Sequence, residues 1–193
     1  MLKRTKKLAL NFKILRIFFL IPTILVSTPF INHIQDAKAG LEFQWDQNSG
    51  YRRLRWFQKE KKRRFKNKIY FFFRPSDRYS ELLKINLAIP KGFKSNLNKE
   101  KISLCKVRIG GFQSRTKCLE DIPADIEINT DKSSMHSINI YPYSPIPSNK
   151  ENYAIVLKLI NPTRTGLYQF HSYGQPKGKS ASSYLGSWTI MID

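Results

Sequence analysis

The chain has 193 residues and carries 34 Lys and Arg against 14 Asp and Glu, a formal net charge of +20. Hydrophobic residues make up 41% of it, which is enough for a packed core and excludes a wholly disordered basic tail. Nine Gly and ten Pro exclude a collagen-like repeat, and two Cys are too few for a disulfide-stapled miniprotein or a four-cysteine zinc site. The composition therefore indicates one folded and unusually basic domain.

Residues 1–39 have the pattern of a secretory signal peptide. The first 16 residues hold six Lys and Arg and no acid, and residues 17–31 form an uncharged apolar stretch of 15 residues. A spanning helix needs about 20 apolar residues, whereas a positive end, a shorter apolar stretch and an Ala-x-Ala motif are typical of a cleaved signal. We expect cleavage between Ala39 and Gly40, with export to the periplasm or cell envelope. The alternative is an uncleaved anchor in the inner membrane.

Residues 40–68 are predicted to form a basic N-terminal arm. Ten Lys and Arg and a single acid lie between Arg52 and Lys68, with aromatic residues interleaved. Cations neutralise dense anions, and aromatic side chains stack on bases or lie at a lipid interface. The predicted anion-binding residues are Arg52, Arg53, Arg55, Lys61, Lys62, Arg63 and Arg64, with Trp56 and Phe57 as interfacial anchors. For an exported protein the expected anions are envelope lipids or polysaccharides, and nucleic acid is less favoured. A solvated linker is the alternative.

The rest of the chain, residues 69–193, reads as short strands separated by turn residues. Apolar and polar residues alternate in runs of four to eight, broken by Pro, Gly, Ser and Asn. This pattern is typical of a β-sandwich or barrel. The predicted strands include residues 69–73, 83–89, 102–109, 126–128, 138–140, 153–160, 168–170 and 188–192. We expect a single Ig-like β-sandwich domain.

The two cysteines, Cys105 and Cys118, are predicted to form a structural disulfide. Exported chains meet oxidising conditions, which favours a disulfide over a redox or metal pair. If Gly111 and Phe112 are the centre of a two-residue type II′ turn, the cysteines face each other across a hairpin. That pair would be a non-hydrogen-bonded one, in which side chains approach most closely.

Catalytic and metal-binding patterns are weak. The expected mature chain contains two histidines, His136 and His171, and neither lies in a known catalytic motif. An Asp-x-Glu-x-Asn-x-Asp run at residues 125–131 is similar to the start of a calcium loop, but Thr130 stands where that loop needs Gly. We therefore expect no enzymatic activity, no metal and no cofactor, although a dispersed site using one histidine as a base remains open.

Four stretches of this part of the chain carry a further signal: a strand ending in Ile-Pro within residues 82–107, the apolar run at 153–162, Gly-x-Tyr-x-Phe at 166–170 and Tyr-Leu-Gly at 184–186. Together they resemble a family of exported cyanobacterial proteins known only as a domain of unknown function, family number 2808. The resemblance covers roughly residues 69–193. It implies an exported β-sandwich and supplies no catalytic or ligand-binding residues.

Taken together, these patterns predict an exported, non-catalytic envelope or periplasmic protein. It would bind an anionic surface through the basic-aromatic arm. A structural or assembly domain that acts through protein partners is the alternative. A nucleic-acid binder would require an inactive signal peptide.

Overall fold

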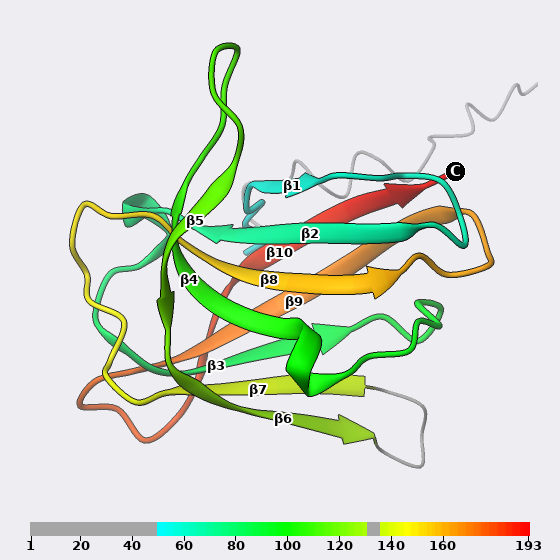
Figure 1. Cartoon of the computed structure of the whole chain (residues 1–193). Coiled ribbons are helices and arrows are strands. Elements are labelled where there is room, and N and C mark those ends of the chain that lie inside the picture. Colours follow the sequence, from blue (N-terminus) through cyan, green and yellow to red (C-terminus); the bar gives the residue numbers. More distant parts are fainter. Residues whose placement is uncertain (1–49, 131–135) are drawn as a thin grey trace, which may run out of the picture. The chain divides into compact units, whose positions relative to one another are not determined.

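The computed structural model describes residues 50–130 and 136–193, which form two packed β-sheets (Figure 1). One sheet has the strand order β1-β2-β8-β4-β5 and the other the order β10-β9-β3-β7-β6. Every neighbouring pair is antiparallel. The predicted all-β class is confirmed, with the two-sheet architecture of Ig-like sandwiches. The predicted signal peptide and its cleavage site at Ala39 and Gly40 lie outside the described residues.

The first sheet consists of β1 (Trp56–Gln58), β2 (Lys66–Phe73), β8 (Tyr153–Ile160), β4 (Ile102–Arg108) and β5 (Lys117–Ile122). The second consists of β10 (Ser183–Ile192), β9 (Gly166–Pro176), β3 (Leu82–Ile89), β7 (His136–Pro142) and β6 (Ala124–Thr130). Two 3-10 turns, η3 (Pro75–Asp77) and η4 (Lys99–Lys101), precede β3 and β4. The strands predicted from alternation are all present. Strand β1 had not been predicted, and β5 had been expected only as the second strand of the cysteine hairpin. No helix within the described ranges is long and apolar enough to cross a membrane.

The core lies between the sheets and is rich in aromatic side chains. Alternation along β2 sends Ile69, Phe71 and Phe73 inward, where all three are fully buried. Phe71 stacks on Trp188 of β10 with ring centroids 4.7 Å apart and contacts Phe170 of β9 at 5.0 Å. Aromatic contacts of this kind hold the two sheets together.

The first sheet is apolar on its outer face as well. Tyr70 and Phe72 of β2 belong to a second buried cluster there, with Cys105 of β4 and Val156 of β8. A strand buried on both faces shows no alternation, which explains the continuous apolar run at residues 69–73.

The sandwich begins earlier than residue 69, the boundary predicted between arm and domain. β1 pairs with β2, and Leu54 just before it is fully buried. The Leu54 N–H donates to the Ser187 carbonyl at 2.8 Å, and the Ser187 N–H donates to the Arg52 carbonyl at 2.7 Å. Residues from Arg52 onward are therefore part of the domain. Leu54 and Trp56 point inward and alternate with arginines. This two-residue period is the signal of a strand, but the many charges around it make it hard to recognise in the sequence.

Candidate functional site

The predicted anion-binding residues do not form one cluster. The β1–β2 hairpin places Arg53 and Arg55 beside the end of β2, because the Phe72 N–H donates to the Arg55 carbonyl at 3.0 Å. Four other predicted cations lie in the connecting loop, residues 59–65, at the start of β2; they are Lys61, Lys62, Arg63 and Arg64. The eight residues of β2 separate the two groups (Figure 1).

A groove of about 480 Å³ lies where β1 begins and β2 ends, and we call it the cationic groove. Its charged lining residues in the described part of the chain are three arginines, Arg53, Arg55 and Arg74, and no carboxylate lines it. The remaining lining residues are Leu54, Trp56, Phe57, Phe72, Ile109, Gly110 and Thr116. The groove therefore combines positive charge with apolar walls, which suits an anionic group carried on a less polar molecule.

The aromatic residues of the groove are placed differently from one another. Trp56 is half-buried against the core, and the Arg53 guanidinium lies 5.4 Å from its ring centroid. Phe57 is 42% exposed and packs against Tyr70 at 6.0 Å. Of the two predicted anchors, Phe57 is thus the more exposed.

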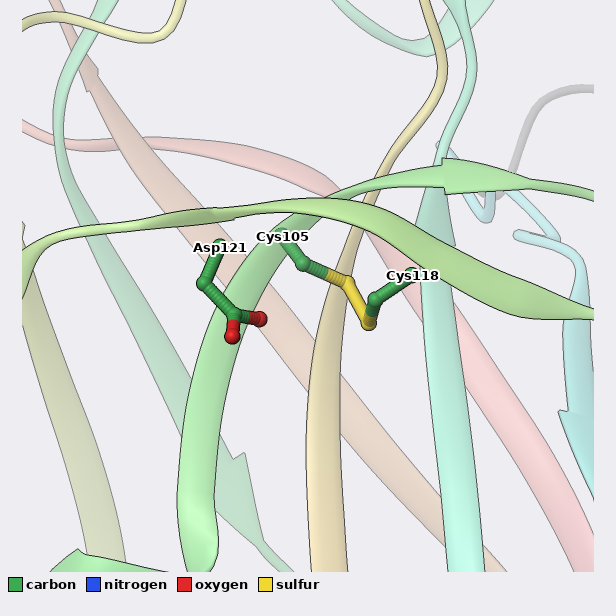
Figure 2. A group of neighbouring side chains, drawn as sticks. All are labelled: Cys105, Cys118 and Asp121. Carbon is green, nitrogen blue, oxygen red and sulfur yellow. A yellow bond between two sulfur atoms is a disulfide. The ribbon is translucent and has the colours of Figure 1, made fainter.

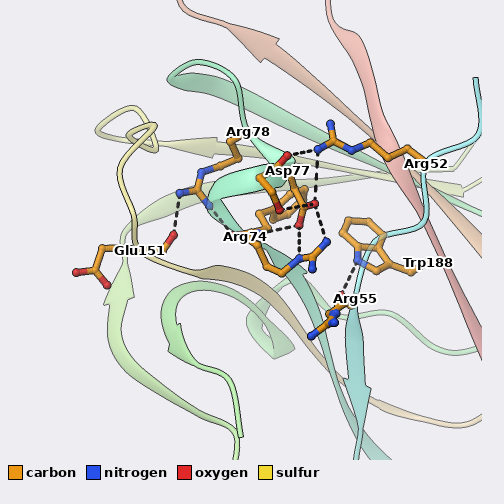
Figure 3. Close-up of polar contacts among 9 residues, drawn as sticks. Arg52, Arg55, Arg74, Asp77, Arg78, Glu151 and Trp188 are labelled. Carbon is orange, nitrogen blue, oxygen red and sulfur yellow. Dashed lines mark hydrogen bonds and ion pairs between the residues drawn. The ribbon is translucent and has the colours of Figure 1, made fainter. Parts of the chain in front are cut away.

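A buried carboxylate binds Arg74 of the groove lining and also Arg52, which does not line the groove (Figure 3). Asp77 in η3 is almost fully buried and accepts hydrogen bonds from the Arg74 backbone N–H at 2.9 Å and from Arg74 Nε at 3.0 Å. Arg52 lies 3.7 Å from the same carboxylate and also donates to the Ser76 carbonyl. One buried acid thus serves two cations, and the local charge stays positive.

Arg78, next to this network, has a structural role. It is buried, lies 4.6 Å from the ring centroid of Tyr153 and donates to the Glu151 carbonyl at 2.8 Å. Burial lowers the pKa of its guanidinium, with Tyr153 and then Asp77 acting in the opposite direction. Because arginine keeps its charge in proteins, Arg78 anchors the loop before β8 as a cation.

The connecting loop, residues 59–65, is tied down by backbone hydrogen bonds. The Arg63 N–H donates to the Asp193 carbonyl, and the Asp193 N–H donates to the Lys61 carbonyl, both at 2.9 Å. The Glu60 carboxylate accepts the N–H groups of Lys62 and Lys61, and these bonds lower its pKa. The four predicted cations in the loop are exposed on an ordered support.

A second basic groove, of about 640 Å³, was not predicted from the sequence. Its lysines come from three separate segments, with Lys66 in β2, Lys158 in β8 and Lys99 and Lys101 in η4. Because these lysines are far apart in the sequence, no local run of charge indicated this groove.

The predicted disulfide between Cys105 and Cys118 is present, with the Cα atoms 5.7 Å apart (Figure 2). The predicted register of the hairpin is wrong, since Cys105 is opposite Asp121 and Cys118 is opposite Val107. The reason is a β-bulge between Lys106 and Val107 together with a longer loop in place of the two-residue turn. The bridge therefore crosses the ladder diagonally.

The disulfide also leaves little to hold a metal. Asp121 lies close to the two sulfur atoms, and the three ligand atoms are within 4.8 Å of one another (Figure 2). With both sulfurs bonded to each other, neither is a thiolate, which is the form that binds metals.

One of the two histidines left open as a possible base, His171, contacts a buried serine. Its Nδ1 lies 2.7 Å from the Ser187 hydroxyl, which is also 2.6 Å from the Tyr184 hydroxyl. Ser187 is fully buried and its N–H is already donated to Arg52, so it offers neither an accessible nucleophile nor an oxyanion donor. Burial lowers the pKa of His171.

The calcium-like run at residues 125–131 lies mainly in β6, as the predicted half-buried strand. Ile126 and Ile128 pack against the core, and the Asp125 carboxylate accepts a hydrogen bond from the Tyr143 hydroxyl at 3.0 Å. That hydrogen bond raises the pKa of Tyr143. Asp131 lies outside the described residues.

Comparisons with solved structures find only distant likenesses. The bacterial hydrophobin BslA has 12% identity and a TM-score of 0.43, covering 74% of this chain and 95% of its own. A collagen-binding domain of a Staphylococcus aureus adhesin has 16% identity and a TM-score of 0.33, covering 66% and 87%. The collagen-binding subdomain of the Enterococcus faecalis surface protein ACE has 9% identity and a TM-score of 0.36, covering 70% and 95%.

The sequence comparisons are more informative about the family. No curated protein matches the chain significantly. The family described as "Protein of unknown function (DUF2808)" matches residues 47–192, which include β1 and the cationic groove as well as the strands on which the resemblance was based. The chain belongs to the DUF2808 family of proteins of unknown function.

Proposed function

We propose that this protein is an exported, non-catalytic protein that binds anionic groups of the cell envelope through the cationic groove. The observation that supports the proposal most is the lining of that groove. It brings three guanidinium groups together beside exposed Phe57, with no carboxylate among the described residues that line it. Guanidinium groups bind carboxylate and phosphate oxygens in a bidentate geometry, with less hydration to lose than an ammonium group.

The environment expected for the protein narrows the anions it can meet. A disulfide is typical of exported proteins, and the sequence begins with a signal-peptide pattern. Phosphate-bearing lipids and acidic polysaccharides are the dense anions outside the cytoplasm. The expected partners are thus still anionic lipids or polysaccharides of the envelope. The surface that binds them is the cationic groove at one end of the sandwich, and not a separate N-terminal arm.

Binding to two immobilised anions would test the proposal, one a polymer (dextran sulfate) and the other phosphatidylglycerol vesicles. The double variant Arg53→Glu with Arg55→Glu should weaken retention on at least one of them, and added salt should release the parent protein. The matched control is Lys61→Glu with Arg63→Glu, which changes the net charge equally at the other end of β2. Equal losses in the two double variants, or no retention of the parent, would overturn the proposal.

A further inference from the structure

The loop between β4 and β5, residues 109–116, extends well beyond the sheet (Figure 1), and we call it the hairpin loop. Phe112 lies in it and is fully exposed, the most exposed large hydrophobic residue in the described chain. A single exposed aromatic residue is ordinary at a protein surface, so Phe112 gains meaning only from its place in a protruding loop and from the charges around that loop. A binding partner for the hairpin loop would need to offer both an apolar region and negative charge.

The hairpin loop is held in a defined shape at its base. The Cys105–Cys118 disulfide crosslinks the two strands, and the Gly111 N–H donates to the Ser114 carbonyl at 3.0 Å. The Gly110 N–H donates to the Thr116 hydroxyl at 3.0 Å, and a Cβ on Gly110 would lie 2.5 Å from the Thr116 nitrogen. A loop fixed in this way can present Phe112 without a large ordering cost on binding.

Cations surround the stem of the hairpin loop. Arg108, Arg115 and Lys117 are exposed on its two sides, and none of the ion pairs found among the described residues includes them. The cationic groove reaches the same stem, because Ile109, Gly110 and Thr116 form part of its wall. The hairpin loop therefore presents an apolar side chain, Phe112, and carries cations between that side chain and the sheet.

We propose that this end of the protein docks on an anionic lipid bilayer, with Phe112 inserted among the acyl chains and the surrounding cations at the headgroups. This inference rests on the proposed function and commits it to lipid. Interfacial binding needs apolar side chains that reach about 5–10 Å into the boundary and basic residues behind them. Each Lys or Arg near an anionic surface adds to the attraction. An acidic polysaccharide would use the same cations but has no apolar interior for Phe112.

The connecting loop at residues 59–65 offers a natural control. It too carries an exposed aromatic residue among cations, Phe65, which is 56% exposed with the Lys62 ammonium 5.9 Å from its ring centroid. Phe65 is only partly exposed and lies at the other end of β2 from the hairpin loop. Docking through the hairpin loop leaves it in solvent.

The test measures binding to vesicles of phosphatidylglycerol and phosphatidylcholine in equal parts. The parent protein and every variant are compared in the same state of signal-peptide cleavage. Phe112→Ser should weaken binding by roughly tenfold or more, since burial of a Phe side chain is lost, whereas Phe65→Ser should bind like the parent. Phe112→Trp should bind as well as the parent. Its additional emission should shift to the blue on these vesicles and stay unchanged on dextran sulfate.

The outcomes separate this inference from the proposed function. If Phe112→Ser binds the vesicles as tightly as the parent, or if the added tryptophan shows no shift, docking through Phe112 is wrong. In that case a loss confined to Arg53→Glu with Arg55→Glu would still support the cationic groove as an anion site. If the parent binds neither vesicles nor dextran sulfate, both proposals fail. Because Phe112 is fully exposed, unchanged urea midpoints should show that each Phe112 variant is folded.

Discussion

Trp188 donates its indole N–H to the Arg55 backbone carbonyl at 3.0 Å (Figure 3). The same carbonyl accepts the Phe72 N–H at 3.0 Å. Two hydrogen bonds from opposite sheets therefore fix the backbone of a residue whose side chain lines the cationic groove. The core tryptophan thus positions a surface arginine.

Loss of the indole N–H should loosen that position. Trp188→Phe is expected to reduce the free energy of unfolding by about 1–3 kcal/mol, since a hydrogen bond and part of the buried volume are lost. Urea denaturation measures the cost, and retention on dextran sulfate should fall as well. Tyr168→Phe removes a comparable bond to the Arg164 carbonyl elsewhere. A fall in retention with that control as well would argue against a specific effect on the groove.

Gly186, the glycine of the Tyr-Leu-Gly stretch, allows the chain before β1 to approach β10. Its φ is +146°, and a Cβ there would lie 2.6 Å from Leu54 Cγ and 2.7 Å from the Arg52 carbonyl oxygen. Gly186→Ala should therefore displace the segment that leads to the groove and cost about 2–3 kcal/mol. Gly111→Ala, which has open space around its Cβ position, is the control. Equal stability of the two variants in urea would contradict this assignment.

Asp77 should matter far more than an exposed acid. Its side chain is 2% exposed and serves both Arg74 and Arg52. Asp77→Ala leaves those cations without their carboxylate and should reduce stability by about 3 kcal/mol. Glu81→Ala removes an exposed ion pair with Lys177 and should change stability by less than about 1 kcal/mol. Thermal unfolding of the two variants should separate them clearly, and similar values would contradict this role for Asp77.

The disulfide should stabilise the fold and support the hairpin loop. Cys105 and Cys118 are separated by 13 positions, and closing a loop of that size contributes roughly 3 kcal/mol. Replacement of both cysteines by Ser should lower the urea midpoint and weaken vesicle binding, because the loop loses its fixed base. Reducing agent should lower the midpoint of the parent and leave the double variant unaffected. An equal response of both proteins would mean that the bridge contributes no stability.

Stability should also decrease with mild acidification through His171. Burial lowers the pKa of this side chain in the folded state, so the unfolded chain binds the proton more readily near pH 6. More protons bound in the unfolded state mean that the free energy of unfolding falls as the pH drops through the ordinary histidine range. Urea titrations between about pH 7.5 and 5.5 should show this slope, and His171→Gln should reduce it. An unchanged slope in the variant would assign it to other groups.

Much of the fold was accessible from the sequence because each buried strand has a local pattern. The alternation from Leu83 to Ile89 and the apolar run from Tyr153 to Ile160 predicted β3 and β8, which supply part of the core. Strand β1 was missed because Trp56 and the buried Leu54 just before the strand are embedded in a charge run. Strand β5 was expected only as the second strand of the cysteine hairpin, because four of its six residues are exposed and it has no apolar alternation of its own.

The sequence by itself determined the all-β class, the disulfide partners and the density of cations near the start of the domain. These are properties of composition and of residues close together in the chain. Only the tertiary structure decided how the cations divide between the two ends of β2 and how Arg74 joins Arg53 and Arg55. It also decided that Phe112 projects beyond the sheet. The physical reason is that strand pairing and a β-bulge set these distances, and both depend on contacts between residues far apart in sequence.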